Sequence, residues 1–482
     1  MPQNFCSVST TINLYKRLNQ YLDLQQRKEF ENSLHLILDK ESLYYKQVCN
    51  TECFNKSLLR DTNIDDYSLV KGKEMLREEG RQYALRKKEI SFKYESCEDE
   101  ISLSFSPLNI MANDGENDIF PNGMVAFIGK NGSGKSTLLY RLATELYTSA
   151  NNRTIDIAPK DIVVSQLMLF SYSPFDDFVL PIQKDELALK DWYEKNLKFK
   201  ETQNDAYKPR FIYCGLRNVE NEVKSLVDSY KENEKFEVEN RIKKQIPQNI
   251  EKISDECRKA FVKALRQDDW NDFIDDVNKE IPELATSLNE MKSASIFNEN
   301  EWYMLFKKLS TGHKFFLHAM SHLIAYGEEN AIVMFDEPEN HLQPPLLSFM
   351  MKKIRKVLVK RSSVMLVATH SPVILQEILS SNVRVICRNG DRLLIKKPSI
   401  ETYGASFGAI SSEVFGLSSD KVSYFDVLKT VFEQKQCVNM KTVKEVIDCI
   451  EEYLGDISDV AIRYVVQLYL KASQGDENVA HS

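Results

Sequence analysis

The chain has 482 residues, of which 43% are hydrophobic and 28% charged, as in ordinary folded globular proteins. Its formal net charge of −8 argues against binding nucleic acid through a generally basic surface, although a local basic patch stays compatible with it. Apolar runs fall short of the roughly 18 residues that span a bilayer, and the first residues do not resemble a signal peptide. These features predict a cytoplasmic protein that does not contact a membrane.

The nine cysteines are scattered along the chain, and only Cys49 and Cys53 lie close together in sequence. A zinc site read from sequence needs a second cysteine or histidine pair at a suitable spacing, and this pair has none. The cytosol also keeps thiols reduced. We therefore expect nine thiols that are neither linked in disulfides nor bound to metal.

Changes in pattern divide the chain into five segments. Residues 1–90 alternate short apolar clusters with charged helical stretches, and no role is assigned to them. Residues 91–180 begin a lobe that residues 301–400 complete, and the motifs described below lead us to expect an ATPase lobe. Between them, residues 181–300 are rich in Lys, Glu, Asn and Asp, with apolar residues at helical spacing, which predicts a helical insertion. Residues 401–482 are again helical, and we expect them to dock a partner.

The predicted fold class is α/β, because short apolar runs alternate with helical segments. Strands are expected at 101–105, 124–128, within 161–172, at 331–335 and at 364–369. Helices are expected at 138–147 and 314–326, and amphipathic helical periodicity extends over 443–470.

A phosphate-binding loop follows the apolar run at 124–128. Its residues are Gly129, Lys130, Asn131, Gly132, Ser133, Gly134, Lys135, Ser136 and Thr137. Glycines let backbone N–H groups converge on phosphates, and the helix that begins there adds the positive end of its dipole. Lys135 is expected to neutralise the β- and γ-phosphates of ATP, the Ser136 hydroxyl to bind Mg²⁺, and Thr137 to support the loop and the α-phosphate.

Two acids follow the apolar run at 331–335. Asp336 is expected to hold Mg²⁺, and Glu337 to polarise the attacking water. An Asp-Glu pair after a strand is common by chance, and the phosphate loop upstream is what gives this pair its meaning.

Two further motifs resemble elements of ATP-binding-cassette proteins. Ser310, Thr311 and Gly312 precede a helix, as the family's signature does, and Ser310 is suited to cap that helix. In that family the signature closes over ATP held by an opposing subunit, which implies a head-to-tail dimer with two ATPs between its subunits, or a higher oligomer. His370 ends the next strand, 34 residues after Asp336, where the family places a switch histidine that contacts the γ-phosphate and the attacking water.

Two assignments are less direct. The segment 339–342 stands where cassette proteins place a short loop that contacts the partner subunit. The family also expects a glutamine after the strand that follows the phosphate-loop helix. Gln166 and the Ser-Pro-Phe-Asp turn at 173–176 are both candidates, and we favour the turn.

Spacing separates the possible cassette proteins. Lys135 and Ser310 lie 175 residues apart, farther than in a compact transport cassette, while the intervening segment is too short for the long coiled coils of Rad50- and SMC-type proteins. Residues 390–482 contain no Asp-x-Asp, so a nuclease centre of the Toprim type is not expected in this chain.

The chain resembles the PtuA family, the ATPases of Septu and retron-linked Septu-like antiphage systems. The resemblance rests on the turn at 173–176, the short helical insertion, and residues 403–410 leading into 414–416. It implies an ATP- and Mg²⁺-dependent regulatory ATPase with an HNH nuclease on a separate chain, and it implies contact with nucleic acid through the complex. A retron reverse transcriptase with its RNA–DNA product can join such systems. Two alternatives remain open: a DNA-repair or chromosome-handling ATPase that binds DNA directly, and a transport cassette.

Overall fold

The computed structural model divides into two compact units, Met1–Gly404 and Ala405–Ser482. The residues that it describes are 6–8, 14–15, 18, 22–38, 40, 42–54, 72–73, 76, 89–94, 100–104, 123–148, 153–158, 164–173, 178–183, 186–202, 208–232, 247–390, 392–415 and 423–477.

The first unit contains a seven-stranded sheet in the order β10–β9–β3–β8–β7–β5–β6. All neighbouring strands are parallel except β10, which pairs antiparallel with β9 at one edge. The strands are β3 (Met124–Ile128), β5 (Leu167–Ser171), β6 (Phe211–Gly215), β7 (Ile332–Asp336), β8 (Val364–Thr369), β9 (Val383–Asn389) and β10 (Arg392–Lys396). Because the strands are parallel, the carboxyl ends of β3, β8, β7 and β5 meet at one edge of the sheet.

Four of the predicted strands lie at the centre of this sheet. β3 and β8 match their predicted bounds in full, β7 is displaced by one residue, and β5 falls within 161–172. All four are buried along their whole length. Burial on both faces explains why their sequences are unbroken apolar runs rather than alternating ones.

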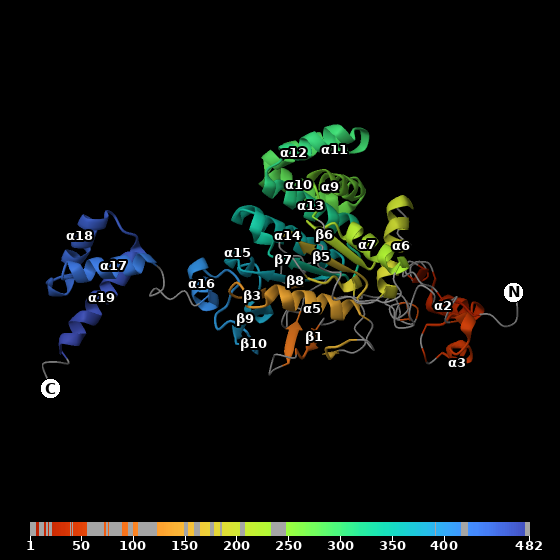
Figure 1. Ribbon diagram of the computed structural model, residues 1–482, viewed down its shortest axis with the longest axis horizontal. Coiled ribbons are helices and arrows are strands. Elements are labelled where there is room, and N and C mark those ends of the chain that lie inside the picture. Colours follow the sequence, from red (N-terminus) through yellow and green to blue (C-terminus); the bar gives the residue numbers. More distant parts are fainter. Residues whose placement is uncertain are drawn as a thin grey trace. The chain divides into compact units, whose positions relative to one another are not determined.

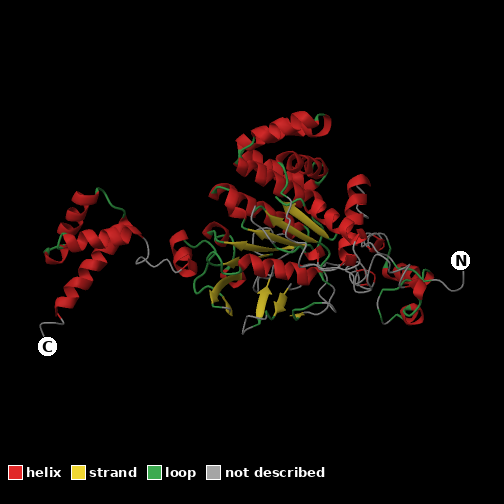
Figure 2. Cartoon of the chain, viewed as in Figure 1, coloured by secondary structure: helices red, strands yellow, loops and turns green. Residues whose placement is uncertain are grey.

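Helices cover both faces of the sheet (Figures 1 and 2). α5 (Lys135–Tyr147) packs on one face, against β7 and β8, while α13 (Thr311–Tyr326) and α14 (Pro344–Lys360) cover the other. The core between α5 and the sheet includes Val125, Phe127, Leu142 and Leu366. The unit is therefore a layered α/β domain, as predicted. Short helical turns connect its elements: η3 (Pro181–Gln183), η5 (Pro338–His341), α15 (Pro372–Leu375) and η6 (Ser380–Asn382).

A small antiparallel sheet, β2–β1–β4, adds to the first unit. Its strands are β1 (Glu89–Phe92), β2 (Ile101–Ser104), as predicted, and β4 (Ile157–Ala158). Arg384 of β9 is buried, and its Nε donates to the backbone oxygen of Ser102 at 3.2 Å. This contact ties the small sheet to the large one.

The segment 181–300 is not wholly helical, and the prediction is wrong at β6. Its helices are α6 (Glu186–Thr202), α7 (Val219–Glu232), α9 (Ile250–Ala264), α10 (Asp268–Glu280) and α11 (Pro282–Phe297), and α12 (Glu299–Lys308) follows. Between α6 and α7, however, β6 pairs with β5 and completes the main sheet. Five residues of strand between long charged helices give too short a period-two signal to stand out.

Ion pairs join α10 to α14. Lys353 is 2% exposed and pairs with Asp276, whose carboxylate also accepts from Lys356 at 2.9 Å. One turn or more away, Arg361 Nη2 lies 2.7 Å from Asp269 Oδ2. This row of ion pairs fixes α10 to α14, which covers the sheet.

The amino-terminal region contributes α2 (Leu24–Ser33) and α3 (Leu43–Val48). Asp23 caps α2 through a capping box, in which its carboxylate accepts from the backbone N–H of Gln26 at 2.8 Å. Both helices fit the expected helical character of residues 1–90. Most of the charged stretch 71–90 lies outside the described residues.

The second unit is helical, with α16 (Phe407–Phe415), α17 (Ser423–Gln434), η8 (Cys437–Asn439), α18 (Val443–Leu454) and α19 (Asp459–Glu477). It has an apolar cluster of its own. This cluster consists of Leu428, Val431, Phe432, Cys437, Val446, Ile450, Ala461 and Val465. Among the helices that the structure describes, none is long and apolar enough to cross a membrane.

Candidate active site

The phosphate-binding loop connects the end of β3 to the start of α5. Gly134 precedes α5 with φ 96°, a left-handed conformation that favours glycine, and no side chain caps the helix. Ser133 Oγ is buried and has no hydrogen-bond partner within the described part of the chain. Uncapped backbone N–H groups and an unpartnered buried hydroxyl at a helix amino terminus fit an anion such as a phosphate.

Lys135 lies at the base of this loop. It is 4% exposed, and its Nζ donates to the backbone oxygens of Gly129 at 3.0 Å and of Lys130 at 3.2 Å. Burial lowers the pKa of Lys135, and the nearby carboxylates of Glu337 and Asp336 oppose that change. A buried cation beside carboxylates is ready to exchange its backbone acceptors for phosphate oxygens.

The predicted Mg²⁺ ligands come together across 200 residues of sequence. Ser136, in the first turn of α5, donates through Oγ to Asp336 Oδ1 at 2.9 Å, and Asp336 ends β7. A hydroxyl and a carboxylate are oxygen ligands of the kind that Mg²⁺ prefers, so these residues fit the ion. Of the other loop residues, Lys130, Asn131, Gly132 and Thr137 are exposed.

Tyr140 was not predicted and also belongs to this site. Its hydroxyl donates to Asp336 Oδ2 and lies 3.3 Å from Ser171 Oγ. The Tyr140 ring stacks on Phe178, with 3.4 Å between ring centroids. The sequence did hold a weak signal for it, because Tyr140 lies four residues after Ser136 and therefore on the same face of α5.

Glu337 directly follows β7 and has a backbone φ of 46°, which is rare for a residue other than glycine. Its backbone N–H donates to the oxygen of Ala368 at 2.9 Å, and its Oε2 accepts from Asn340 Nδ2 at 2.8 Å. Its side chain is 28% exposed. The unusual backbone angle and the contact with Asn340 direct this carboxylate to the edge of the sheet where the phosphate loop lies.

His370 directly follows β8, at the strand end predicted from sequence. Its Nδ1 lies 4.0 Å from Glu337 Oε1 and 3.1 Å from Glu339 Oε1. Glu339 also accepts from the Thr369 hydroxyl at 2.6 Å and from the His370 backbone N–H at 2.5 Å. Sequence reasoning assigned Glu339 only to a loop for partner contact, since its partners lie about thirty residues further along.

The signature-like residues begin α13, three residues earlier than the helix predicted at 314. Ser310 caps this helix as expected, and its hydroxyl accepts from the His313 backbone N–H at 3.2 Å. Ser310 and Thr311 are exposed. A Cβ added at Gly312 would lie 2.9 Å from the backbone oxygen of His341, so this close approach to η5 requires glycine.

Gln166 does not stand at the nucleotide edge. It precedes β5, at the amino end of the strand, and its Oε1 accepts from the Glu328 backbone N–H at 3.1 Å. It therefore lies at the edge opposite to Ser171 and Asp336. The favoured candidate, the turn at 173–176, lies outside the described residues except for Ser173.

Comparison with known proteins agrees with this geometry. Residues 124–376, more than half of the 482 residues, match the family described as "AAA domain, putative AbiEii toxin, Type IV TA system". The chain belongs to this AAA domain family. The matched range begins with β3 and includes the phosphate loop, Asp336, Glu337 and His370.

A curated relative extends beyond the AAA domain. The chain is 27% identical over 461 residues to protein ea59 of Escherichia phage lambda, and the alignment covers 89% of this chain and 77% of the relative. With the phosphate loop, the acids and the parallel sheet, membership of the family identifies residues 124–376 as an AAA-type P-loop ATPase domain. Domains of this type generally use ATP and Mg²⁺.

Proposed function

We propose that this chain is the ATP-hydrolysing regulatory subunit of an antiphage defence complex and that it controls an HNH-type nuclease carried on a separate chain. The observation that carries the hydrolytic part is the position of Glu337 and His370. They follow neighbouring strands, with 4.0 Å between Glu337 Oε1 and His370 Nδ1, beside the Ser136–Asp336 pair.

The proposal gives each group of the site a role that its position supports. Lys135 and the loop N–H groups would bind the phosphates of ATP. Ser136 and Asp336 would hold Mg²⁺, which would supply positive charge to the phosphate oxygens. The carboxylate of Glu337 orients water and accepts its proton. His370, held by Glu339, contacts the same water and the terminal phosphate.

The complete site is proposed to need two copies of the chain. Ser310 and Thr311 are exposed at the amino terminus of α13, where a helix dipole and backbone N–H groups favour an anion. Head-to-tail pairing would bring these residues over the ATP that Lys135 of the other copy holds. Each dimer would then enclose two ATPs, and dimers could assemble further.

Mixing two inactive variants tests the composite site. Lys135→Ala removes the phosphate lysine, and Ser310→Arg blocks the signature. A mixed dimer would contain one site with an intact lysine from one copy and an intact signature from the other. Random pairing should restore about a quarter of wild-type ATPase activity, since about half of the dimers are mixed and each has one good site. Activity that stays at the level of the separate variants would contradict a shared site.

The regulatory part rests on the resemblance to PtuA-type ATPases and on the separate helical unit after residue 404, which offers a surface for a partner. The test is expression of the chain with the HNH nuclease from a PtuA-type system, with and without the associated reverse transcriptase. We expect the nuclease to co-purify with the chain. We also expect the pair to protect cells against phage, and the Glu337→Gln variant to lose that protection. If the purified chain instead binds DNA without any partner, with strong salt dependence, and does not bind the nuclease, the DNA-repair ATPase is favoured.

A further inference from the structure

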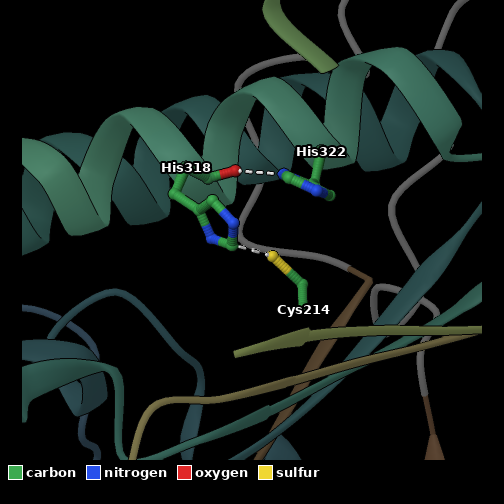
Figure 3. Close-up of side chains that lie close together, drawn as sticks. All are labelled: Cys214, His318 and His322. Carbon is green, nitrogen blue, oxygen red and sulfur yellow. Dashed lines mark hydrogen bonds between the residues drawn. The ribbon is translucent and has the colours of Figure 1, made fainter. Parts of the chain in front are cut away.

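A buried cysteine and two buried histidines that follow it by about a hundred residues meet between the sheet and α13 (Figure 3). Cys214 lies near the end of β6, and His318 and His322 lie one turn apart on the face of α13 that points toward it. Their exposed fractions are 2%, 1% and 6%. One ligand atom from each of them lies within 4.8 Å of the other two.

We propose that Cys214, His318 and His322 bind a zinc ion, with the hydroxyl of Tyr172 in the fourth position. The site lies outside the nucleotide site. It would be a structural site, because all of its ligands are buried.

The donor atoms of these side chains lie close enough together to reach one ion. Cys214 Sγ lies 3.3 Å from His318 Nδ1, and the Tyr172 hydroxyl lies 2.7 Å from the same nitrogen and 3.2 Å from the sulfur. Zinc–nitrogen and zinc–sulfur bonds of about 2.0–2.3 Å place tetrahedral ligands about 3.3–3.8 Å apart. The shell therefore needs side-chain rotations that move the Tyr172 hydroxyl away from the nitrogen and the sulfur. The ligand atom of His322, which lies within 4.8 Å of the other two, would move inward.

The second histidine is oriented as metal ligands usually are. His322 Nδ1 lies 2.8 Å from the backbone oxygen of His318. A ring nitrogen beside a carbonyl oxygen carries the proton, so Nε2 of His322 carries the lone pair that can bind a metal. The separation of four residues places both imidazoles on one face of the helix, as in helical zinc motifs.

His318 faces the site with one of its two ring nitrogens. Nδ1 is the nitrogen that meets the Tyr172 hydroxyl and the Cys214 sulfur. The other nitrogen, Nε2, is buried on the far side of the ring and has no hydrogen-bond partner among the residues that the structure describes. Nδ1 is therefore the atom with which His318 would bind the ion.

Zinc binding would also change the state of the thiol. Burial raises the pKa of Cys214 well above its ordinary value, so without metal the thiol stays protonated. When zinc binds, the S–H proton passes to solvent and the thiolate sulfur forms the bond to the metal. A phenol oxygen in the fourth position, rather than a thioether, favours zinc over copper.

The site would connect elements that surround the nucleotide edge. Cys214 belongs to β6, Tyr172 follows β5, and both histidines belong to the helix that Ser310 caps. The backbone oxygen of Tyr172 in turn lies 3.2 Å from His341 Nε2 in η5. A metal ion here would fix α13, and with it the signature residues, relative to the sheet.

This proposal differs from the expectation that the cysteines bind no metal. That expectation rested on spacing along the chain, and Cys214 stands 104 residues before His318. A ligand set assembled by strand β6 and one helix turn has no sequence signature of its own. Among the described residues, this is the one group of three Cys, His, Asp or Glu side chains that lie close enough together to share a metal ion.

The first test is the metal content of the untagged full chain, purified from zinc-supplemented cells and dialysed against metal-free buffer. We expect about one zinc per chain by mass spectrometry of the metals. Loading the zinc-free chain with Co²⁺ should give the absorption of a tetrahedral cobalt–thiolate centre. Less than about one-tenth of a zinc per chain, both as purified and after incubation with zinc, would overturn the proposal.

Variants then assign the ligands. Cys214→Ser and His322→Gln should each reduce bound zinc at least fivefold and abolish the cobalt–thiolate absorption or alter it. Cys257→Ser is the matched control, because Cys257 on α9 is equally buried and is not among the proposed ligands. Zinc retained by both ligand variants, or lost equally from the control, would contradict the assignment.

If the variants fail to fold, the thermal stability of the wild-type chain still tests the proposal. Removal of zinc with a chelator should lower the melting temperature by several degrees, and zinc, but not Mg²⁺, should restore it. An unchanged melting temperature after complete zinc removal would contradict a structural site.

Discussion

Glu339 holds the backbone of His370 and lies beside its imidazole ring. Its Oε1 accepts from the His370 backbone N–H at 2.5 Å and lies 3.1 Å from the ring nitrogen Nδ1 of the same residue. It also accepts from the Thr369 hydroxyl at 2.6 Å. The carboxylate thus joins η5, directly after the two acids of β7, to the end of β8. It is a positioning residue for the histidine that faces Glu337.

Removing this carboxylate should slow hydrolysis without weakening ATP binding. For Glu339→Ala we expect kcat to fall about tenfold or more while KM for ATP changes less than threefold, because only the histidine's position is lost. Glu339→Gln keeps an acceptor oxygen and should recover part of the activity. The matched control is Glu301→Ala, at an exposed glutamate in the first turn of α12. An equal fall in kcat for Glu339→Ala and Glu339→Gln would argue against the positioning role.

Loss of the Glu337 carboxylate should stop turnover and preserve nucleotide binding. We expect Glu337→Gln to lower kcat by about 10²–10⁴-fold, the contribution usual for a general base. The amide still fits the space and can still contact Asn340 Nδ2 through its oxygen. Equilibrium binding of ATP should stay within about twofold of the wild type. Steady-state phosphate release and fluorescent-nucleotide titration measure the two effects, and near-normal turnover would rule out Glu337 as the base.

The Tyr140 hydroxyl should matter for Mg²⁺ more than for ATP. Tyr140→Phe keeps the ring stacked on Phe178 and removes the donor to Asp336 Oδ2. We expect the Mg²⁺ concentration for half-maximal ATPase activity to rise severalfold, because Asp336 loses the group that orients it. Stability should fall by about 1 kcal/mol. Tyr303→Phe, on α12 and away from this site, should change neither quantity, and an unaltered Mg²⁺ dependence for Tyr140→Phe would contradict the role.

Because of the row of ion pairs between α10 and α14, part of the free energy of unfolding should depend on pH. Burial alone would raise the pKa of Asp276, but hydrogen bonds from Lys353 and Lys356 outweigh it and lower the pKa to about 2. A carboxyl whose pKa is lower in the folded state stabilises the fold above its unfolded pKa of about 3.9. That stabilisation should be lost as the pH falls from about 4 to about 2.

Replacing this carboxylate leaves a buried lysine partly unpaired. We expect Asp276→Asn to lower the free energy of unfolding by about 1–3 kcal/mol near pH 7, measured by urea denaturation. The neighbouring Asp275 is exposed, so Asp275→Asn removes the same charge and should change stability by less than about 0.5 kcal/mol. The gap between the two variants should narrow below about pH 4. A gap that is constant with pH would mean that the ion pairs do not cause it.

Local sequence patterns predicted the parts of the site that a strand and the loop after it define. β3 leads into Lys135, β7 into Asp336 and β8 into His370, and each pairing of an apolar run with polar residues is visible within about ten residues. The Ser310 cap was predicted for the same reason. These features depend on short-range backbone geometry, which the local order of apolar, polar and capping residues indicates directly.

The features that the sequence did not reveal depend on contacts between distant segments. Tyr140 meets Asp336 across 196 residues, and Cys214 meets His318 across 104. β6 was missed because five residues carry little periodicity, and the sheet, rather than its own sequence, decides that it is a strand. In each case tertiary packing supplies information that no local window contains.

The strand at one edge of the main sheet limits how copies of this chain can join. β10 exposes Arg392 and Lys396 at the edge of the sheet, where no further strand among the described residues pairs with it. Two copies that extended their sheets through this edge would bring these positive charges together, a known defence against fibril-like growth. If copies of the chain join as proposed above, we therefore expect their contacts at loops and helix ends rather than along β10.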